Sequence, residues 1–502
     1  MGPQSIARRV VTEELQEQFA AVSGDRNPMH MDGLAARRTQ AGLRVVHGVH
    51  TLLWALEALV ACSRILAPPS RIKVRFLKWV YLNDECLLTV PPEAGGDPQR
   101  LQVDVLGLPV LSADLRYGTP SIRPAAAGII PPSGVPLASP LDLSFAELDK
   151  RAGFAYTACA PDIVRLFPHL CGLIGVAAVA ELTACSYVVG MEAPGLHSMF
   201  SKIDVAICNE SFSADSTRTA LPFRVIEQDE RFRKARIAVN GRGIDGTLDV
   251  FVRVPPVAQA SMSAIAERLQ PGEFAGMDAL IIGGSRGLGE VTAKLIAAGG
   301  GRSTITYAVG KRDAQSVVDQ IRGGGGDARM FAYDVRKSPQ AQLLGLETSF
   351  THLFYFATNA IFRPKKSLVS PPILGDFIAF YLLGFHDVCV ALIGARESHN
   401  GPGGKLIVYY PSSVAVQERP PGMTEYAMVK AAGELLCADM NQYLPGLQVM
   451  TSRLPRLLTD QTATVVPGQD QEPLDILLPL VREMRRLAHS SASPAGADAP
   501  AG

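Results

Sequence analysis

Two short stretches of this sequence hold residues that could move protons. In the C-terminal half, Tyr426 and Lys430 stand one helical turn apart in Thr-Glu-Tyr-Ala-Met-Val-Lys, so a helix would place them on one face. A tyrosine can give its phenolic proton to a carbonyl oxygen, and a neighbouring cation can lower its pKa from the ordinary value of about 10. Ser413 lies upstream, where it could hydrogen-bond the same carbonyl. The three residues predict a site that reduces a carbonyl group.

A glycine-rich turn further upstream could bind the hydride donor that this site needs. It follows an apolar strand, Ala279 to Ile282, and opens a helix. Glycines allow positive φ and close approach to a pyrophosphate, whose charge is favoured at a helix N-terminus. The alternative is a glycine-rich loop of no function, which is our interpretation of Gly323–Gly326. The predicted dinucleotide contacts are Gly283, Ser285, Arg286, Gly287, Leu288 and Gly289.

Residues after the next strands bear on which dinucleotide binds. Lys311 and Arg312 follow the second strand, where a carboxylate would accept ribose hydroxyls and a cation would hold the 2′-phosphate of NADP(H). We therefore expect NADP(H), although the two residues also fit a solvated helix start. Asp334 follows the third strand and could contact the adenine. Asn359 follows the fourth strand and would lie near the cofactor.

The second stretch lies near the N-terminus and pairs a carboxylate with an imidazole. Asp25 and His30 share one loop, and Asn27 between them is a candidate contact for the substrate or its oxyanion. Adding or removing water next to a thioester needs two proton transfers, which such a pair can divide. Gly48 opens an apolar helix after His47, and its free N–H could bind the developing enolate oxygen. Taken alone, Asp25 and His30 favour a capping loop with a structural histidine.

Two breaks divide the chain into three segments. The expected order is a segment at 1–118, a proline-rich linker at 119–140, a segment at 141–256, a linker at 257–276, a segment at 277–488 and a disordered tail at 489–502. In the first segment, an apolar helix from Gly48 to Val60 precedes strand-like runs at 72–81, 86–90, 101–106 and 110–117. A helix that is apolar all round predicts a curved antiparallel sheet around it.

The second segment repeats this order, and the third follows a different one. A long helix at 167–191 precedes strand-like runs at 198–207, 221–226, 236–239 and 247–254, which we interpret as an internal duplication. The third segment alternates helices with strands at 279–282, 304–308, 328–333, 352–356, 406–410 and 448–453. That alternation predicts a parallel, doubly wound sheet.

Composition limits the partners and the compartment. The formal net charge is zero and no basic run occurs, so we expect neither nucleic acid nor a membrane as a partner. The eight cysteines are scattered, without Cys-x-x-Cys or zinc spacing, so we expect no metal and a reducing compartment. The N-terminus lacks an apolar signal core. Together these features predict a soluble, cytoplasmic protein.

The third segment resembles the short-chain dehydrogenases/reductases over about 277 to 462. The matching positions are Gly283, Gly287, Gly289, Asp334, Val335, Ser413, Tyr426 and Lys430. The resemblance implies a Rossmann-type fold, a nicotinamide cofactor that also touches Val335, Tyr426 and Lys430, and a catalytic Ser-Tyr-Lys set. Two positions depart from the pattern. Ala357-Thr358-Asn359-Ala360 replaces Asn-Asn-Ala-Gly, and Tyr381 stands where the family has an asparagine that supports a water relay to the lysine.

The first segment resembles the MaoC-type (R)-specific enoyl hydratases and dehydratases of hot-dog fold, from about 9 to 117. Asp25 and His30 match that family's catalytic pair, and Gly48 falls at its oxyanion glycine. The second segment resembles the partner half of a double hot-dog by element order only. In it, Glu192 and His197 are either a second acid–base pair or part of a turn. The overall prediction is an α+β double hot-dog followed by an α/β Rossmann-type doubly wound parallel sheet.

These resemblances imply a bifunctional enzyme for 3-oxoacyl thioesters carried on acyl carrier protein or CoA. NADPH-dependent reduction would give the 3-hydroxyacyl group and dehydration the 2-enoyl group, as in fatty-acid-like or polyketide biosynthesis. One alternative is a thioester-binding or dehydratase protein with an inactive reductase. Another is a reductase of non-thioester carbonyls with a hot-dog dimer platform. Both parent folds usually associate, so a homodimer is expected.

Overall fold

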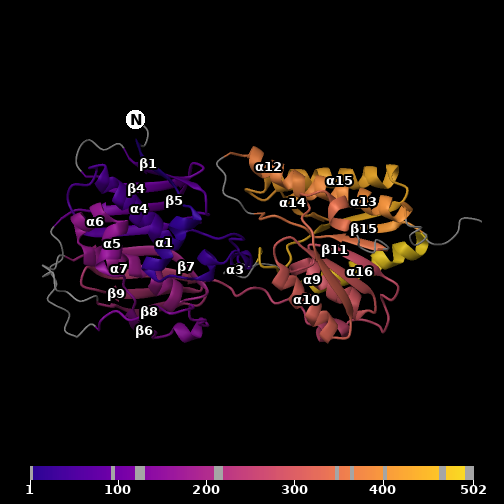
Figure 1. The fold of residues 1–502 in the computed structure, drawn as a ribbon, viewed down its shortest axis with the longest axis horizontal. Helices are drawn as coiled ribbons and strands as arrows, with labels where there is room; N and C mark the ends of the chain where they lie inside the picture. The colour runs from indigo at the N-terminus through magenta and orange to yellow at the C-terminus, as the bar shows by residue number, and fades with distance from the viewer. Residues whose placement is uncertain are drawn as a thin grey trace, which may run out of the picture. The chain divides into compact units, whose positions relative to one another are not determined.

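The computed structural model describes residues 4–91, 97–118, 131–208, 219–344, 350–361, 367–398, 404–462 and 471–491. These residues form two compact units that divide between Pro256 and Val257 (Figure 1).

In the N-terminal unit the described strands form one antiparallel sheet. They are β1 (Gln4–Val10), β2 (Arg71–Phe76), β3 (Glu85–Val90), β4 (Arg100–Val105), β5 (Leu108–Arg116), β6 (Ala152–Ala155), β7 (Ser198–Ile207), β8 (Leu221–Asp229), β9 (Lys234–Asn240) and β10 (Ile244–Val252). The helices are α1 (Glu13–Ser23), α2 (Pro28–Met31), α3 (Gly33–Arg37), α4 (Gly48–Ala61), η1 (Ala146–Leu148), α5 (Ala160–Leu166), α6 (Pro168–Ile174), α7 (Val176–Tyr187) and η2 (Val188–Glu192).

The strand order of this sheet repeats in reverse about its centre. It runs β1-β3-β4-β5-β2-β7-β10-β9-β8-β6, so β6 to β10 mirror β1 to β5 across the antiparallel β2–β7 pair. Arg71 of β2 and Asp204 of β7 form an ion pair of 2.7 Å across that junction. The duplication predicted from element order is therefore present in the strand topology.

The two apolar helices α4 and α7 lie in the large hydrophobic core of this unit. Leu52, Leu53 and Leu56 of α4 and Leu182 of α7 are at most 1% exposed, as expected for helices that other structure surrounds. The predicted single helix at 167–191 is wrong, because α6 and the stretch from α7 to η2 meet at 115°. Gly175 lies at the break with φ of +86°, a conformation that glycine adopts without strain.

In the C-terminal unit the described strands form one parallel sheet. They are β11 (Asp278–Ile282), β12 (Arg302–Tyr307), β13 (Asp327–Ala332), β14 (His352–Tyr355), β15 (Leu406–Ser413) and β16 (Leu447–Leu454), in the order β13-β12-β11-β14-β15-β16. The helices are α8 (Met262–Ala266), α9 (Gly287–Ala298), α10 (Lys311–Gly323), α11 (Pro339–Leu343), α12 (Pro371–Ile378), η3 (Ala379–Leu383), α13 (Gly384–Ser398), α14 (Ala415–Glu418), α15 (Thr424–Tyr443) and α16 (Pro473–Ser491).

Helices cover both faces of this sheet. Strand β11 is therefore buried on both sides, which explains why its sequence is apolar throughout. Ala279 and Ile281 pack into the core that α9, α10 and α16 share, whereas Leu280 and Ile282 pack into the core with α13 and α15 (Figure 1). A strand that is buried on both faces reads as a continuous apolar run. The order reverses direction between β11 and β14, which is where ligands bind in sheets of this kind.

One helical stretch of the described residues, Pro371–Glu397, is long and apolar enough to cross a membrane by length and composition alone. The bent pair of α6 with α7 and η2 passes the same test. Within the C-terminal unit, Phe385, Val388 and Cys389 of the first stretch are fully buried against the sheet. The stretch therefore has one face that belongs to this core.

Some expected boundaries differ from the structure. Strands β1 and β6 were not expected, and β2 ends at Phe76 rather than continuing to residue 81. Ile265 and Phe274 are fully buried in the C-terminal core, so residues 257–276 are not a free linker. Helix α16 continues to Ser491, past the start of the predicted tail, and 492–502 lie outside the described residues. Most of the predicted linker, 119–130, also lies outside them.

A buried carboxylate fixes α7 against the turn between β9 and β10. Glu181 accepts hydrogen bonds from the N–H groups of Arg242, Gly243 and Ile244 at 2.9, 2.8 and 2.9 Å. A Cβ at Gly241 would lie 2.1 Å from its Oε2 atom, so the turn needs glycine there. Burial raises the pKa of Glu181 from 4.5 to about 7, and the three hydrogen bonds act in the opposite direction.

This carboxylate predicts a pH dependence of stability. Its folded pKa lies above its unfolded pKa, so its contribution is complete below pH 4.5 and is lost as pH rises through about 7, at roughly 1.4 kcal/mol per pH unit. Glu181→Gln should lower stability overall and remove that slope. Urea unfolding followed by tryptophan fluorescence measures it, because Trp54 and Trp79 are the chain's two tryptophans. Equal slopes in the two proteins would contradict the prediction.

Candidate active sites

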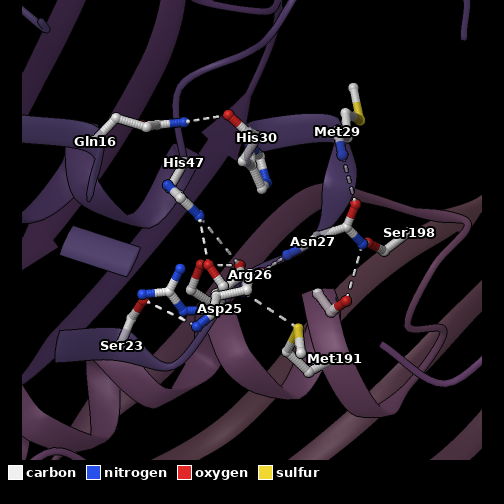
Figure 2. Close-up of polar contacts among 12 residues, drawn as sticks. Gln16, Ser23, Asp25, Arg26, Asn27, Met29, His30, His47, Met191 and Ser198 are labelled. Carbon is white, nitrogen blue, oxygen red and sulfur yellow. Dashed lines mark hydrogen bonds and ion pairs between the residues drawn. The ribbon is translucent and has the colours of Figure 1, made fainter. Parts of the chain in front are cut away.

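The loop that carries Asp25 is held by contacts with the second half of the N-terminal unit. Helix α1 ends at Gly24, whose φ is +73°. Asn27 caps α2 by accepting a hydrogen bond from the Met29 N–H at 3.0 Å. Its amide nitrogen donates to the carbonyl oxygens of Gly190 and Gly195 at 2.9 and 3.0 Å (Figure 2). Asn27 therefore positions the loop and is not turned toward a substrate, which corrects its predicted substrate role.

The Asp25 carboxylate is buried between the two halves. Only 1% of the residue is exposed. One carboxylate oxygen accepts the Asn27 N–H at 3.1 Å, and the other accepts the Ser186 hydroxyl at 2.6 Å. A Cβ at Gly190 would lie 2.3 Å from Asp25 Oδ1, so only glycine leaves room for the carboxylate. Burial raises the pKa of Asp25, while His30 and the Ser186 hydrogen bond act against that rise.

His30 is oriented by a backbone carbonyl. Its Nδ1 lies 2.8 Å from the Val45 oxygen, and because a carbonyl only accepts, Nδ1 carries a proton. Burial lowers the pKa of His30. The neutral ring then has an unprotonated Nε2. The structure thus pairs a carboxyl whose protonated form is favoured with an imidazole whose neutral form is favoured.

His47 joins this pair, although the sequence marked it only as the residue before Gly48. Its Nε2 donates to the Asp25 backbone oxygen at 3.0 Å (Figure 2), and its ring centroid lies 3.9 Å from that of His30. Burial lowers the pKa of His47 well below its ordinary value. Ligand atoms of Asp25, His30 and His47 lie within 4.8 Å of one another, close enough for a metal ion. His30 and His47 each donate one ring N–H to a backbone carbonyl, which fixes the tautomer of each neutral ring.

Gly48 begins α4, as the sequence predicted. Its N–H belongs to the first helical turn, where no intrahelical acceptor exists, and none of the described residues accepts a hydrogen bond from it. A Cβ there would lie 2.8 Å from the Phe76 ring. Asp25, His30, Gly48 and Ser186 all line one cavity of about 80 Å³, to which both halves contribute.

The second predicted pair in this unit does not form. Glu192 binds Arg151 at 2.8 Å, and His197 binds Asp142 at 3.2 Å. The stretch that contains Glu192 and His197 joins η2 to β7. It is therefore a turn in which Glu192 and His197 bind other residues and not each other.

In the C-terminal unit, β15 and α15 bring the predicted Ser-Tyr-Lys set together. Ser413 is the last residue of β15, and its hydroxyl hydrogen-bonds Tyr426. Lys430 Nζ donates to the Pro411 oxygen at 2.7 Å. It lies 4.1 and 5.8 Å from the ring centroids of Tyr381 and Tyr426. The structure thus brings Ser413, Tyr426 and Lys430 together, as the sequence predicted. The sequence gave no indication of the contact between Lys430 and Tyr381.

The electrostatics of this set differ from the expectation. Burial raises the pKa of Tyr426 to about 12, and the Ser413 hydrogen bond acts against that rise. Burial also lowers the pKa of Lys430 to about 7. Contrary to the expectation, the pKa of Tyr426 is therefore raised and not lowered, because burial is the largest effect on it.

Tyr381 occupies the position of the expected asparagine within η3. Its hydroxyl lies 2.6 Å from the Thr358 hydroxyl, and its ring lies edge-on to Tyr426 with centroids 5.6 Å apart. Lys430 is thus enclosed by aromatic rings, including Tyr410 at 4.8 Å. Cations are attracted to such ring faces.

The glycine-rich turn joins β11 to α9 as predicted. Gly283 and Gly287 have φ of +81° and +57°, and a Cβ at Gly289 would lie 2.4 Å from the Gly283 oxygen. The tight strand–turn–helix geometry fits a dinucleotide pyrophosphate at the helix N-terminus. Ser285 is buried in this turn and Leu288 is partly buried.

The polar residues that were predicted to bind the cofactor differ in their partners and in their exposure. Arg286 forms an ion pair of 2.8 Å with Asp460, a partner that sequence reasoning missed. Lys311 and Arg312 are exposed at the start of α10. Asp334 accepts two hydrogen bonds from Arg336, both at 2.9 Å. Val335 is buried, and the Asn359 side chain accepts the Ala360 N–H at 2.8 Å.

Comparison with known families assigns a class to each unit. Residues 1–95 match the family described as MaoC like domain, and residues 278–452 match short chain dehydrogenase. The chain therefore joins a MaoC-like domain to a short-chain dehydrogenase domain, the class that uses nicotinamide cofactors. The parallel sheet is the Rossmann-like fold of that class. The antiparallel sheet region is consistent with a hot-dog fold.

Individual relatives match part of the chain. A hydroxynaphthalene reductase-like protein, Arp2, of Metarhizium brunneum is 31% identical over 170 residues, which cover 33% of this chain and 61% of that protein. The short chain dehydrogenase claC of Passalora fulva is 34% identical over 83 residues, 16% of this chain and 31% of that protein. The chain thus spans less than two thirds of either relative.

Two solved structures are similar at low identity. A dehydrogenase/reductase from Sinorhizobium meliloti 1021 has a TM-score of 0.36 and 21% identity, covering 44% of this chain and 91% of its own. A 3-oxoacyl (acyl-carrier-protein) reductase from Agrobacterium tumefaciens C58, with NADP bound, has a TM-score of 0.34 and 20% identity, covering 44% and 88%.

The turn geometry yields a direct test of cofactor binding. Gly289→Ala should weaken nicotinamide cofactor binding at least about tenfold, because its Cβ would force the turn apart. Gly323→Ala is the matched control, since a Cβ there meets nothing within 4 Å. Titration of NADPH fluorescence measures both. Equal affinity in the two variants would contradict the assignment of this turn.

Proposed function

We propose that the chain is a bifunctional enzyme for 3-oxoacyl thioesters, carried on acyl carrier protein or CoA. The C-terminal unit reduces the β-ketone with NADPH, and the N-terminal unit dehydrates the 3-hydroxyacyl product to the 2-enoyl thioester. The observation that carries the proposal is the pair of buried Asp25 and half-buried His30 beside the Gly48 N–H in one cavity. The family matches and the reductase names of the relatives support consecutive steps of polyketide or fatty-acid-like chemistry.

The dehydration step follows from the pKa directions. Neutral His30 takes the proton from the α-carbon through Nε2 while the Gly48 N–H donates to the thioester oxygen, where negative charge develops. Protonated Asp25 gives its proton to the β-hydroxyl, and the carbon–oxygen bond breaks to release water. The proton on His30 then returns to Asp25. The reverse sequence hydrates an enoyl thioester. The second half, which completes a double hot-dog in this proposal, holds Asp25 through Ser186.

The reduction step uses Tyr426 as the proton donor and Ser413 as a hydrogen-bond donor to the substrate carbonyl. A bound nicotinamide supplies the hydride. A tyrosine with a pKa of about 12 stays protonated across the physiological range, which suits a donor. Lys430 carries the positive charge that favours phenolate formation once Tyr426 gives up its proton.

We propose NADP(H) as the cofactor, with Lys311 and Arg312 at the start of α10 available to a 2′-phosphate. Arg286 would have to leave Asp460 to take part. We further propose a cytoplasmic homodimer that binds neither nucleic acid nor membrane. The eight cysteines are scattered along the sequence without Cys-x-x-Cys spacing, which supports a reducing compartment.

Tyr381 favours a second candidate function. It replaces the asparagine of the relay, and its ring lies on Lys430. This arrangement suits a dehydratase whose reductase domain binds the cofactor without turnover. Turnover of any 3-oxoacyl thioester with NADPH would reject this candidate.

If the two reactions have separate sites, a substitution in one site should remove only one activity. Tyr426→Phe removes the donated proton, so it should reduce ketone reduction at least about a hundredfold and leave dehydration unchanged. Asp25→Asn should do the converse, because an amide cannot replace the carboxylic acid. NADPH oxidation and enoyl absorbance measure the two activities. Loss of both activities in either variant would contradict separate sites.

The buried lysine predicts the pH profile of reduction. Burial lowers the pKa of Lys430 to about 7, so the free enzyme loses this positive charge as pH rises through about 7. The ratio kcat/KM for NADPH should therefore fall about tenfold per unit above that pH. Lys430→Arg, whose guanidinium stays charged, should remove this fall in whatever activity it retains. A wild-type profile that is level to pH 9 would contradict the assignment.

A further inference from the structure

Two aromatic rings close the cavity that holds Asp25 and His30. Phe76 ends β2 and Phe200 lies in β7, so the rings come from the two strands that join the halves of the unit. Their centroids lie 5.0 Å apart at an angle of 47°, and both rings line the cavity. The remaining apolar lining includes Val110, Leu111 and Met199.

Phe76 also lies directly against the predicted oxyanion site. Its Cε1 and Cδ1 atoms are 2.8 and 2.9 Å from the position of a Cβ at Gly48. A thioester oxygen bound by the Gly48 N–H would place the reacting carbons beside this ring. The rest of the acyl chain would occupy the same cavity, whose wall includes Phe76 and Phe200.

The volume of the cavity limits the length of the acyl chain that it can hold. Its volume is about 80 Å³, whereas pockets for drug-sized ligands hold roughly 300–1,000 Å³. Close-packed interiors do not admit additional methylene groups without moving side chains. A longer chain would have to push the two rings apart. Both residues lie in paired strands, Phe76 opposite Leu111 of β5 and Phe200 opposite Val250 of β10.

We propose that this site selects short acyl thioesters over long ones, and that Phe76 and Phe200 set the limit. The inference rests on the proposed dehydratase function and specifies its substrate class. Phe200 comes from the second half of the unit, so that half determines specificity as well as orienting Asp25.

The test compares hydration of crotonyl-CoA and trans-2-octenoyl-CoA by the full chain, followed by loss of enoyl absorbance. Wild type should have a kcat/KM for crotonyl-CoA at least about tenfold higher, the range that a few methylene groups produce in an apolar pocket. Phe200→Ala should reduce that ratio about tenfold or more by raising activity on the octenoyl substrate. Phe154→Ala is the matched control, because Phe154 is 56% exposed on β6, and it should leave the ratio unchanged.

Three results would overturn the inference. Equal or higher wild-type activity on octenoyl-CoA would show that the rings do not limit length. An equal loss on both substrates in Phe200→Ala would give Phe200 a structural role only, and Phe200→Leu decides the matter if the alanine variant does not fold. Hydration of neither substrate by wild type would reject the proposed dehydratase itself, which separates failure of the function from failure of the specificity.

Discussion

The burial of one carboxylate between two halves of a duplicated sheet determines the N-terminal site. A carboxyl group with 1% exposure keeps its ionised form only at a cost, so its surroundings decide which form prevails. Asp25 receives hydrogen bonds from its own loop and from Ser186, which lies far along the chain. The Asn27 side chain holds that loop to the backbone carbonyls of Gly190 and Gly195. Neither half could provide this setting by itself.

In the C-terminal unit, burial likewise shifts the pKa of an ionisable side chain, in this case a cation. Lys430 lies among three tyrosine rings with a backbone carbonyl as its hydrogen-bond acceptor, and burial lowers its pKa toward neutrality. Tyr426 beside it is kept protonated. In each unit burial therefore raises the pKa of an acid, Asp25 or Tyr426, and lowers the pKa of a base, His30 or Lys430. Shifts of this kind are typical of groups that exchange protons with a substrate.

Local patterns predicted the parts of both sites that depend on neighbouring residues. The glycine turn, the Tyr426–Lys430 spacing, the Asp25–His30 loop and the Gly48 helix start were all visible because a few adjacent residues create them. Most predicted strands fell within a few residues of those observed. The first edge strand was missed because it includes Arg8 and Arg9 and has no apolar run, and all its residues are exposed or partly exposed.

Contacts between distant segments could not be predicted in this way. Ser186 meets Asp25 across 161 positions, and Asp460 meets Arg286 only once the sheet has formed. The ring of Tyr381 over Lys430 depends on how η3 packs against α15. The shifted pKa values depend on burial, which no spacing rule provides. The break at Gly175 was available as a glycine in an apolar run, but its angle depends on packing.

The most direct test of the account is mass spectrometry of a 3-oxobutyryl thioester incubated with the purified chain and NADPH. The account predicts a product that has gained two hydrogens, followed by one that has also lost a water molecule. An unchanged substrate, or a hydroxyacyl product that persists without losing water, would contradict the claim that one chain performs both steps.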